Sequence, residues 1–231
     1  MDFSPEGPMA IPLWINGHAF LTVSEAFFDV AHPVSGEIVR RVPLCGADEA
    51  AEAVAAASAA QPGWAAMGLM ARRVCLGRLA EALSTYRGHF SRLLLQEIEG
   101  DEASAGAQVD AAVAALQDAA VGETGLVGVV LDASTPLLSF ARAVAPALMA
   151  GATVVVKPSP KAPGAVYALC ELSARAEWPA GVLNLLQGDS AALTGLCRQP
   201  LDRLVYAGEP ALGAQVEALA GREGCRFVSV G

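Results

Sequence analysis

The sequence predicts an α/β protein with a doubly wound, Rossmann-like parallel sheet, preceded by an N-terminal region of helices and small β-hairpins. In the segment 126–160, two short apolar runs flank a stretch with helical spacing. The same alternation of strand and helix continues to the end of the chain. Strands that are apolar on both faces are typical of parallel sheets covered by helices on both sides. We therefore expect a single domain over residues 1–231, with the hairpins and helices in 1–122 and the Rossmann-like core in 123–231.

The central strand-helix-strand unit organises the core. Val127–Leu131 is a short β-branched run, and Pro136–Met149 carries apolar residues at helical spacing. Thr153–Val156 is a second apolar run, which ends at Lys157 and a proline. Ligands of open α/β sheets bind outside the carboxyl ends of the strands, so Lys157 stands at the edge where a ligand is expected.

The rest of the core repeats this pattern with short connections. We expect helices over Pro163–Glu177, Ser190–Arg198 and Ala211–Ala220, and strands over Val182–Leu186, Arg203–Tyr206 and Arg226–Val230.

The N-terminal region combines turns with helices. Asn16-Gly17 predicts a hairpin over Leu13–Phe20, and a second strand pair is expected over Phe27–Val30 and Glu37–Val42. We expect both to be small antiparallel pieces packed on the main domain.

Four helices should follow these hairpins. The first is predicted from an N-cap at Asp48 to Ala60, with Gln61-Pro62-Gly63 as its end. The second, Ala71–Tyr86, is amphipathic, with arginines opposite an apolar side formed by Val74, Leu76, Leu79, Leu83 and Tyr86. The others are expected over Phe90–Ile98 and about 103–120.

Composition excludes several classes of function. The net charge is −9 without a basic cluster, so nucleic acids and anionic membranes are not expected partners. No apolar run reaches the roughly 18 residues of a membrane span, and the start lacks the pattern of a secretory signal. We expect a cytoplasmic protein. Apolar residues make up 54% of the chain, which suggests that a protein partner covers part of its surface.

The cysteines and histidines do not form a metal-binding pattern. The five cysteines are odd in number and never occur as CxxC, which favours buried free thiols over disulfides or a zinc site. These are Cys45, Cys75, Cys170, Cys197 and Cys225. We expect no metal site.

Several motifs in order resemble the aldehyde dehydrogenase superfamily, specifically its coenzyme-binding domain. They are VGVV, APALMAGATVVVKPSP, WPAGVLNLLQG and LVYAGEPALG in the core, with WINGHAF and HPVSGEIV before it. The resemblance implies that a catalytic domain would follow Gly231 and that an oligomerisation arm would lie between Ala120 and Leu126, where only a short link stands. Relative to that family, both are absent from this sequence.

The resemblance places altered residues at the catalytic positions. Ser134 aligns with the asparagine that stabilises the oxyanion, and Ser229 with the glutamate base. Neither serine reproduces the chemistry of the residue it replaces. No cysteine aligns with the nucleophile, so we expect no catalytic residue.

The coenzyme positions are mixed. Lys157 and Ser159 match a family motif that contacts the adenosine ribose, and Gly208 and Gly213 match the turn that faces the pyrophosphate. Glu209 replaces a serine that touches phosphate, which puts a negative charge where another is to bind. We therefore expect no cofactor, or weak binding of NAD(P).

Three functions are compatible with these observations. The first is a catalytically inactive aldehyde dehydrogenase-like subunit, with a structural or regulatory role in a complex with a metabolic enzyme. The second is the coenzyme-binding half of a split or truncated NAD(P)-dependent aldehyde dehydrogenase. The third is a module for a nucleotide other than NAD, with Lys157 holding a phosphate.

Overall fold

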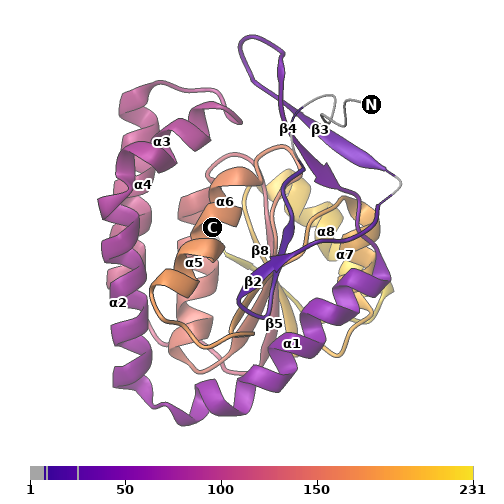
Figure 1. Ribbon diagram of the computed structural model, residues 1–231. Coiled ribbons are helices and arrows are strands. Elements are labelled where there is room, and N and C mark those ends of the chain that lie inside the picture. Colours follow the sequence, from indigo (N-terminus) through magenta and orange to yellow (C-terminus); the bar gives the residue numbers. More distant parts are fainter. Residues whose placement is uncertain (1–7, 9, 25, 231) are drawn as a thin grey trace, which may run out of the picture.

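A seven-stranded sheet forms the centre of the protein in the computed structural model, which describes residues 8, 10–24 and 26–230 (Figure 1). Its order is β2 (His18–Phe20), β1 (Leu13–Ile15), β7 (Leu183–Leu185), β6 (Thr153–Lys157), β5 (Leu126–Leu131), β8 (Arg203–Ala207) and β9 (Phe227–Val230). The five strands from β7 to β9 are parallel, as predicted, and all residues of β5, β6, β7 and β8 are buried.

The Asn16-Gly17 hairpin belongs to this sheet. Its strand β1 pairs antiparallel with β7, and the Asn16 N–H donates to the buried side chain of Asn184 at 3.0 Å. The hairpin is antiparallel, as predicted, but the expectation that it only packs on the main domain was wrong. The same expectation holds for β3 (Phe27–Ala31) and β4 (Ile38–Pro43), which form their own two-stranded sheet beside the domain (Figure 1).

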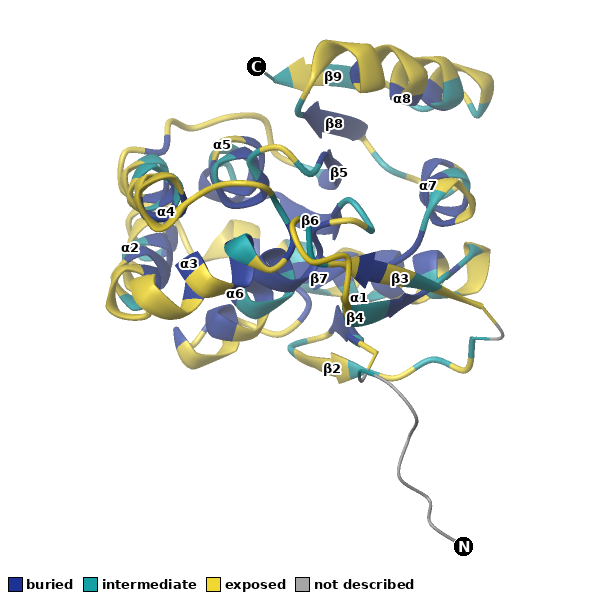
Figure 2. Ribbon diagram, turned by 90° about the horizontal axis from the view of Figure 1, so that it is seen from above, coloured by how far each residue is buried: buried dark blue, intermediate teal, exposed yellow. Residues whose placement is uncertain are grey.

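Helices cover both faces of the sheet, as a doubly wound fold requires (Figure 2). One face packs against α5 (Pro136–Met149) and α6 (Gly164–Arg175), which are backed by α2 (Leu69–Thr85), α3 (Arg87–Leu95) and α4 (Glu102–Gln117). The other packs against most of α1 (Ala47–Ala66), α7 (Ser190–Cys197) and α8 (Pro210–Arg222). No helix of the described residues is long and apolar enough to cross a membrane.

Helix α1 differs from its prediction at both ends. Its N-cap is Gly46 instead of Asp48, and the helix runs through Pro62 to Ala66. Trp64 explains the continuation, because it is fully buried, stacks on Trp178 and donates its indole N–H to the Leu148 carbonyl at 3.0 Å. Tertiary packing thus offsets the backbone hydrogen bond that a proline removes.

Helix α2 buries Leu76, Leu79 and Leu83 as predicted, but the rest of its buried face differs from the prediction. Val74 and Tyr86 are exposed, whereas Arg72 is buried. The Arg72 guanidinium donates to the carbonyls of Met149, Trp64 and Ala65. A charged side chain therefore joins the end of α1 to the end of α5.

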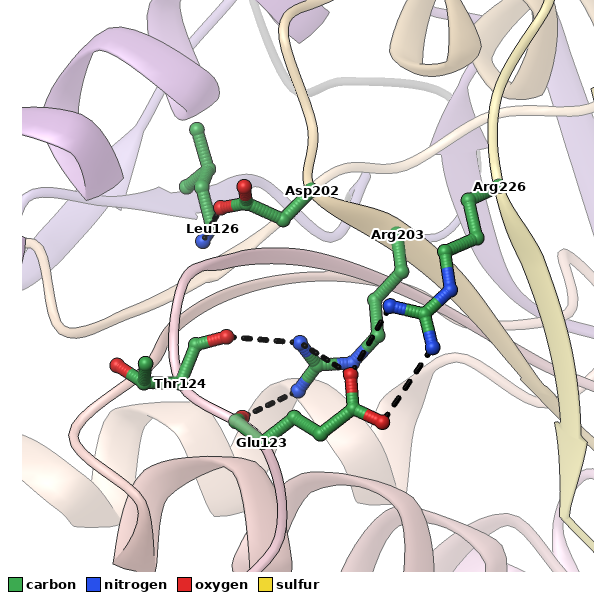
Figure 3. A network of polar contacts seen from close by, with 6 residues as sticks. All are labelled: Glu123, Thr124, Leu126, Asp202, Arg203 and Arg226. Carbon is green, nitrogen blue, oxygen red and sulfur yellow. Dashed lines mark hydrogen bonds and ion pairs between the residues drawn. The ribbon is translucent and has the colours of Figure 1, made fainter.

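At the amino edge of the sheet, a polar network holds the link between α4 and β5 (Figure 3). Arg203 donates to the carbonyls of Thr124 and Glu123, the first at 2.8 Å, and Arg226 pairs with the Glu123 carboxylate at 3.0 Å. The Asp202 carboxylate accepts the Leu126 N–H at 2.6 Å. The short link is thus fastened to β8 and to the residue before β9.

Candidate functional site

The strand order places a ligand crevice between β5 and β8. From β5 the chain adds β6 and β7 on one side and then crosses to place β8 and β9 on the other. In such sheets ligands bind at the carboxyl ends of the strands where the order reverses. Ser134 follows β5 and Glu209 follows β8, so both lie at this switch point.

Asp132 bridges the two strands at the switch point. Its carboxylate accepts the Glu209 N–H at 2.7 Å, and its other oxygen accepts the N–H and the hydroxyl of Ser134 at 3.0 and 2.8 Å. Gly208 has a φ of +154°, and a Cβ there would overlap the Asp132 carboxylate. The buried carboxylate is therefore held in one position by three donors.

The start of helix α8 offers fewer free N–H groups than an ordinary helix N-terminus. Glu209 is its N-cap residue, and the first helical residue is Pro210, which has no N–H. The Glu209 carbonyl accepts the Tyr206 hydroxyl at 2.9 Å and the Gly213 N–H at 3.0 Å. A Cβ on Gly213 would press on the Tyr206 ring, so this glycine allows the close contact. At this turn, one donor is occupied by Asp132 and the next is missing.

Ser134 is not placed to stabilise an oxyanion. Its hydroxyl and its N–H both donate to Asp132. It lines a cleft of about 290 Å³ together with Arg142, Glu209 and Val230. A carboxylate beside the hydroxyl opposes, instead of stabilising, a developing negative charge.

Lys157 lies at the floor of a second cleft of about 290 Å³, between α7 and α8. The residue is 5% exposed, and its ammonium donates to the neighbouring Pro158 carbonyl at 3.3 Å. Burial lowers the pKa of Lys157 to about 8, against the opposing influence of Asp189 and Cys45. Ser159 lies on the same wall of the cleft, and its hydroxyl accepts the Lys161 N–H at 3.3 Å.

Ser229 lies apart from these residues. It is an exposed residue of β9 that pairs in register with Tyr206. Within the described residues, no hydrogen bond joins the Ser229 hydroxyl to a charged group. The carboxyl edge thus brings Ser134 and Glu209 together around Asp132. A wider cleft of about 650 Å³ places Ser159 on the same lining as these residues, and Ser159 also lines the Lys157 cleft.

None of the cysteines is an activated thiol. Burial raises the pKa of Cys45 and Cys197 to about 12, and it also raises those of Cys75, Cys170 and Cys225. A nucleophilic cysteine needs the opposite shift. Four of the thiols are buried, as predicted, but Cys225 is partly exposed. Among the described residues, no group of three or more His, Cys, Asp or Glu side chains could hold a metal ion.

Two features of the site were missed in the sequence. Pro210 follows Glu209 directly, and a proline at the first helical position is a recognisable signal that one N–H is absent. Asp189 caps α7 and lines the Lys157 cleft, but it belongs to no motif that would have marked it.

Comparison with known proteins gives the same family over most of the chain. The model of the aldehyde dehydrogenase family matches residues 20–131 and 122–229. The chain is 29% identical to the succinate-semialdehyde dehydrogenase (NADP(+)) GabD of Escherichia coli, over 87% of this chain and 47% of that protein. It is 32% identical to the N-succinylglutamate 5-semialdehyde dehydrogenase of a Caulobacter strain, over 79% of this chain and 42% of that protein. The chain thus spans about half the length of these relatives.

Solved structures agree on the fold. The lactaldehyde dehydrogenase of Escherichia coli superposes with a TM-score of 0.89 at 22% identity, over 96% of this chain and 52% of that one. Aldehyde dehydrogenase C of Pseudomonas syringae, a C291A mutant in complex with NAD+ and octanal, gives 0.87 at 27% identity, over 95% and 50%. With the motifs, the parallel sheet and the family model in agreement, the chain belongs to the aldehyde dehydrogenase family.

Proposed function

We propose that this chain is a catalytically inactive aldehyde dehydrogenase-like subunit, with a structural or regulatory role in a complex with a metabolic enzyme. The observation that carries the proposal is the N-terminus of α8. There the Asp132 carboxylate accepts the Glu209 N–H, and Pro210 offers none. A helix N-terminus binds phosphate through free N–H groups and its dipole. Here an internal carboxylate occupies one of these N–H groups, and a proline removes another.

The charge of Glu209 adds to the lost donors. A carboxylate within about 4 Å of a phosphate costs on the order of a few kcal/mol at an effective dielectric near 20, or about a hundredfold in affinity. Asp132 adds a second negative charge on the same side of the helix. Tight binding of a dinucleotide pyrophosphate is therefore not expected.

The described residues also lack the catalytic groups that aldehyde oxidation needs. The reaction requires a thiolate, an oxyanion donor and a base. Every thiol has a raised pKa, Ser134 donates to a carboxylate, and Ser229 is a hydroxyl. A role through contact with another protein remains, and the partly exposed Leu212 and Val230 at the carboxyl edge are available for it.

A second function is favoured by the Lys157 cleft. Lys157 and Ser159 line this cleft, and relatives are described with NADP(+) or in complex with NAD+. Gly208 and Gly213, which match the glycines of the family's phosphate turn, flank the N-cap of α8. The chain would then be the coenzyme-binding half of a split or truncated NAD(P)-dependent aldehyde dehydrogenase. Such a half would bind NAD(P) weakly.

Two measurements test the proposal. The first is the oxidation of succinate semialdehyde and lactaldehyde by the isolated chain, with NAD or NADP, followed as reduced coenzyme. We expect no turnover, and measurable turnover would overturn the proposal. The second is the native mass of the chain in an extract of its own cells. A defined complex with an identified metabolic enzyme is expected. A complex in which a cysteine-bearing polypeptide restores aldehyde oxidation would instead establish the split enzyme.

A further inference from the structure

Lys157 is a buried amine without a charged partner. It is 5% exposed, and within the described residues no carboxylate oxygen lies at ion-pair distance from its Nζ. Its hydrogen bond to the Pro158 carbonyl is long, at 3.3 Å. Buried lysines are ordinarily paired, because an isolated buried ammonium is costly. Lys157 instead lines a cleft.

The cleft beside the amine is small and mainly apolar. Its volume is about 290 Å³, and most of its wall is aliphatic. The aliphatic residues are Val130, Leu131, Leu193, Leu212, Val216 and Leu219. Besides Lys157, the polar residues of the lining are Ser159, Asp189, Ser190 and Gln215. A molecule that fits would have an aliphatic body and one polar end that meets Lys157.

We propose that Lys157 is a nucleophilic amine that condenses with small aliphatic aldehydes to form an imine in this cleft. The neutral Nζ attacks the carbonyl carbon and forms the C–N bond of a carbinolamine. The C–O bond then breaks as the C=N bond forms, and the oxygen leaves as water. Solvent carries the two protons of the original amine to this oxygen. One water is released for each imine, and nothing is oxidised or reduced.

The electrostatics of the cleft support a neutral amine near pH 8. The groups that face Lys157 are the Asp189 carboxylate, from the turn before α7, and the Cys45 thiol, from the turn before α1. Burial outweighs both and lowers the pKa of Lys157 to about 8. A lysine with an ordinary pKa near 10.4 is less than about 1% neutral at pH 8, whereas this one is about half neutral. Desolvated lysines of this kind are the ones that form Schiff bases.

The chain contains its own control for this chemistry. Its only two lysines are Lys157 and Lys161, four residues apart on one segment, and Lys161 is exposed. The full chain would be incubated with hexanal at pH 8, and the imine trapped with sodium cyanoborohydride. Peptide mapping by mass spectrometry separates adducts on Lys157, on Lys161 and on the N-terminal amine. We expect Lys157 to be labelled at least tenfold faster than Lys161, with a pH profile that rises around pH 8.

The apolar wall gives a second readout. The ratio of the labelling rates with hexanal and with glyoxylate should be at least tenfold higher at Lys157 than at Lys161, because the carboxylate of glyoxylate is disfavoured by the apolar wall. Lys157→Arg and Lys157→Met should remove the adduct, and Lys161→Arg should retain it. Equal labelling of the two lysines, absence of an adduct on Lys157, or the same hexanal-to-glyoxylate rate ratio at both lysines would overturn the proposal. Because the mapping uses the unmodified chain, it does not depend on the folding of any variant.

Discussion

The Asp132 carboxylate, just after β5, accepts the backbone N–H of Glu209, just after β8, at 2.7 Å. This bond bridges the ends of the two strands at which the sheet order reverses. The Asp132 carboxylate thereby accepts an N–H group at the start of α8 that could otherwise donate to a bound phosphate. The same carboxylate thus stabilises the fold and carries the weak coenzyme binding that we propose.

Asp132→Ala should destabilise the protein by about 1–3 kcal/mol, because it leaves the N–H groups of Glu209 and Ser134 without their acceptor. Unfolding in urea, followed by circular dichroism, measures this change. The control is Ser229→Ala, an exposed position on β9, for which we expect no measurable change. Equal stability of Asp132→Ala and the parent chain would show that water replaces the carboxylate without loss.

The double variant Glu209→Ser, Pro210→Ala should raise the affinity for NAD on the order of tenfold. It removes a negative charge and restores an N–H at the start of α8. Isothermal titration calorimetry measures the affinity at fixed ionic strength. Glu217→Ser removes an exposed charge further along the same helix and should have little effect. If both variants raise the affinity equally, the net charge of the chain, and not the N-terminus of α8, limits binding.

Glu97 should make stability fall as the pH rises. Burial raises its pKa from 4.5 to about 7, although Arg40 and the Gly164 N–H favour the charged form. Between pH 4.5 and about 7 the native state keeps a proton that the unfolded chain has lost, so this contribution is present below pH 4.5 and is gone above pH 7. Relative to Glu97→Gln, the free energy of unfolding should drop by about 2 kcal/mol from pH 5.5 to 7.5. Parallel pH profiles for the two proteins would contradict this pKa.

Two arginines on the Glu123 network should differ in importance (Figure 3). Arg203→Met removes two hydrogen bonds to carbonyls from a side chain that is 7% exposed, and should cost about 2–3 kcal/mol. Arg226→Met breaks an exposed ion pair, and its effect should lie within the error of the measurement. Denaturant unfolding of both variants gives the comparison. A larger loss for Arg226→Met would mean that the exposed pair, not the buried guanidinium, fastens the link before β5.

One thiol should react quickly in the folded chain. Cys225 is partly exposed, and the other four cysteines are buried. With an aromatic disulfide reagent at pH 8, we expect one fast equivalent, which Cys225→Ser removes. In denaturant all five should react. Several fast equivalents in the native chain would indicate that the packing around α7 or α6 opens readily.

The parallel core could be predicted because its signals are local. The apolar runs of β5 and β6 and the helical spacing of Pro136–Met149 each report burial directly, and α5 begins and ends where expected. Prediction failed where distant contacts decide. Pro62 marks a helix end by propensity, but Trp64 packs on Trp178, more than a hundred residues away, and keeps the helix intact.

The candidate site, too, could be predicted only where the signal is local. The sequence places Lys157 at the carboxyl edge, since a lysine follows an apolar strand. It does not reveal that the amine is buried beneath α7 and α8, because the walls of that cleft come from separate segments. Nor does it reveal that Asp132 reaches Glu209, since that contact depends on the crossing from β7 to β8.

The strand order also affects how the chain folds during its synthesis. Strand β5 pairs on one side with β6, which follows soon after it, and on the other side with β8, whose residues 203–207 come some seventy positions later. A polypeptide that leaves the ribosome from its N-terminus therefore carries an open, wholly apolar strand edge until β8 emerges. During that interval, shielding by a chaperone would decide between productive folding and aggregation.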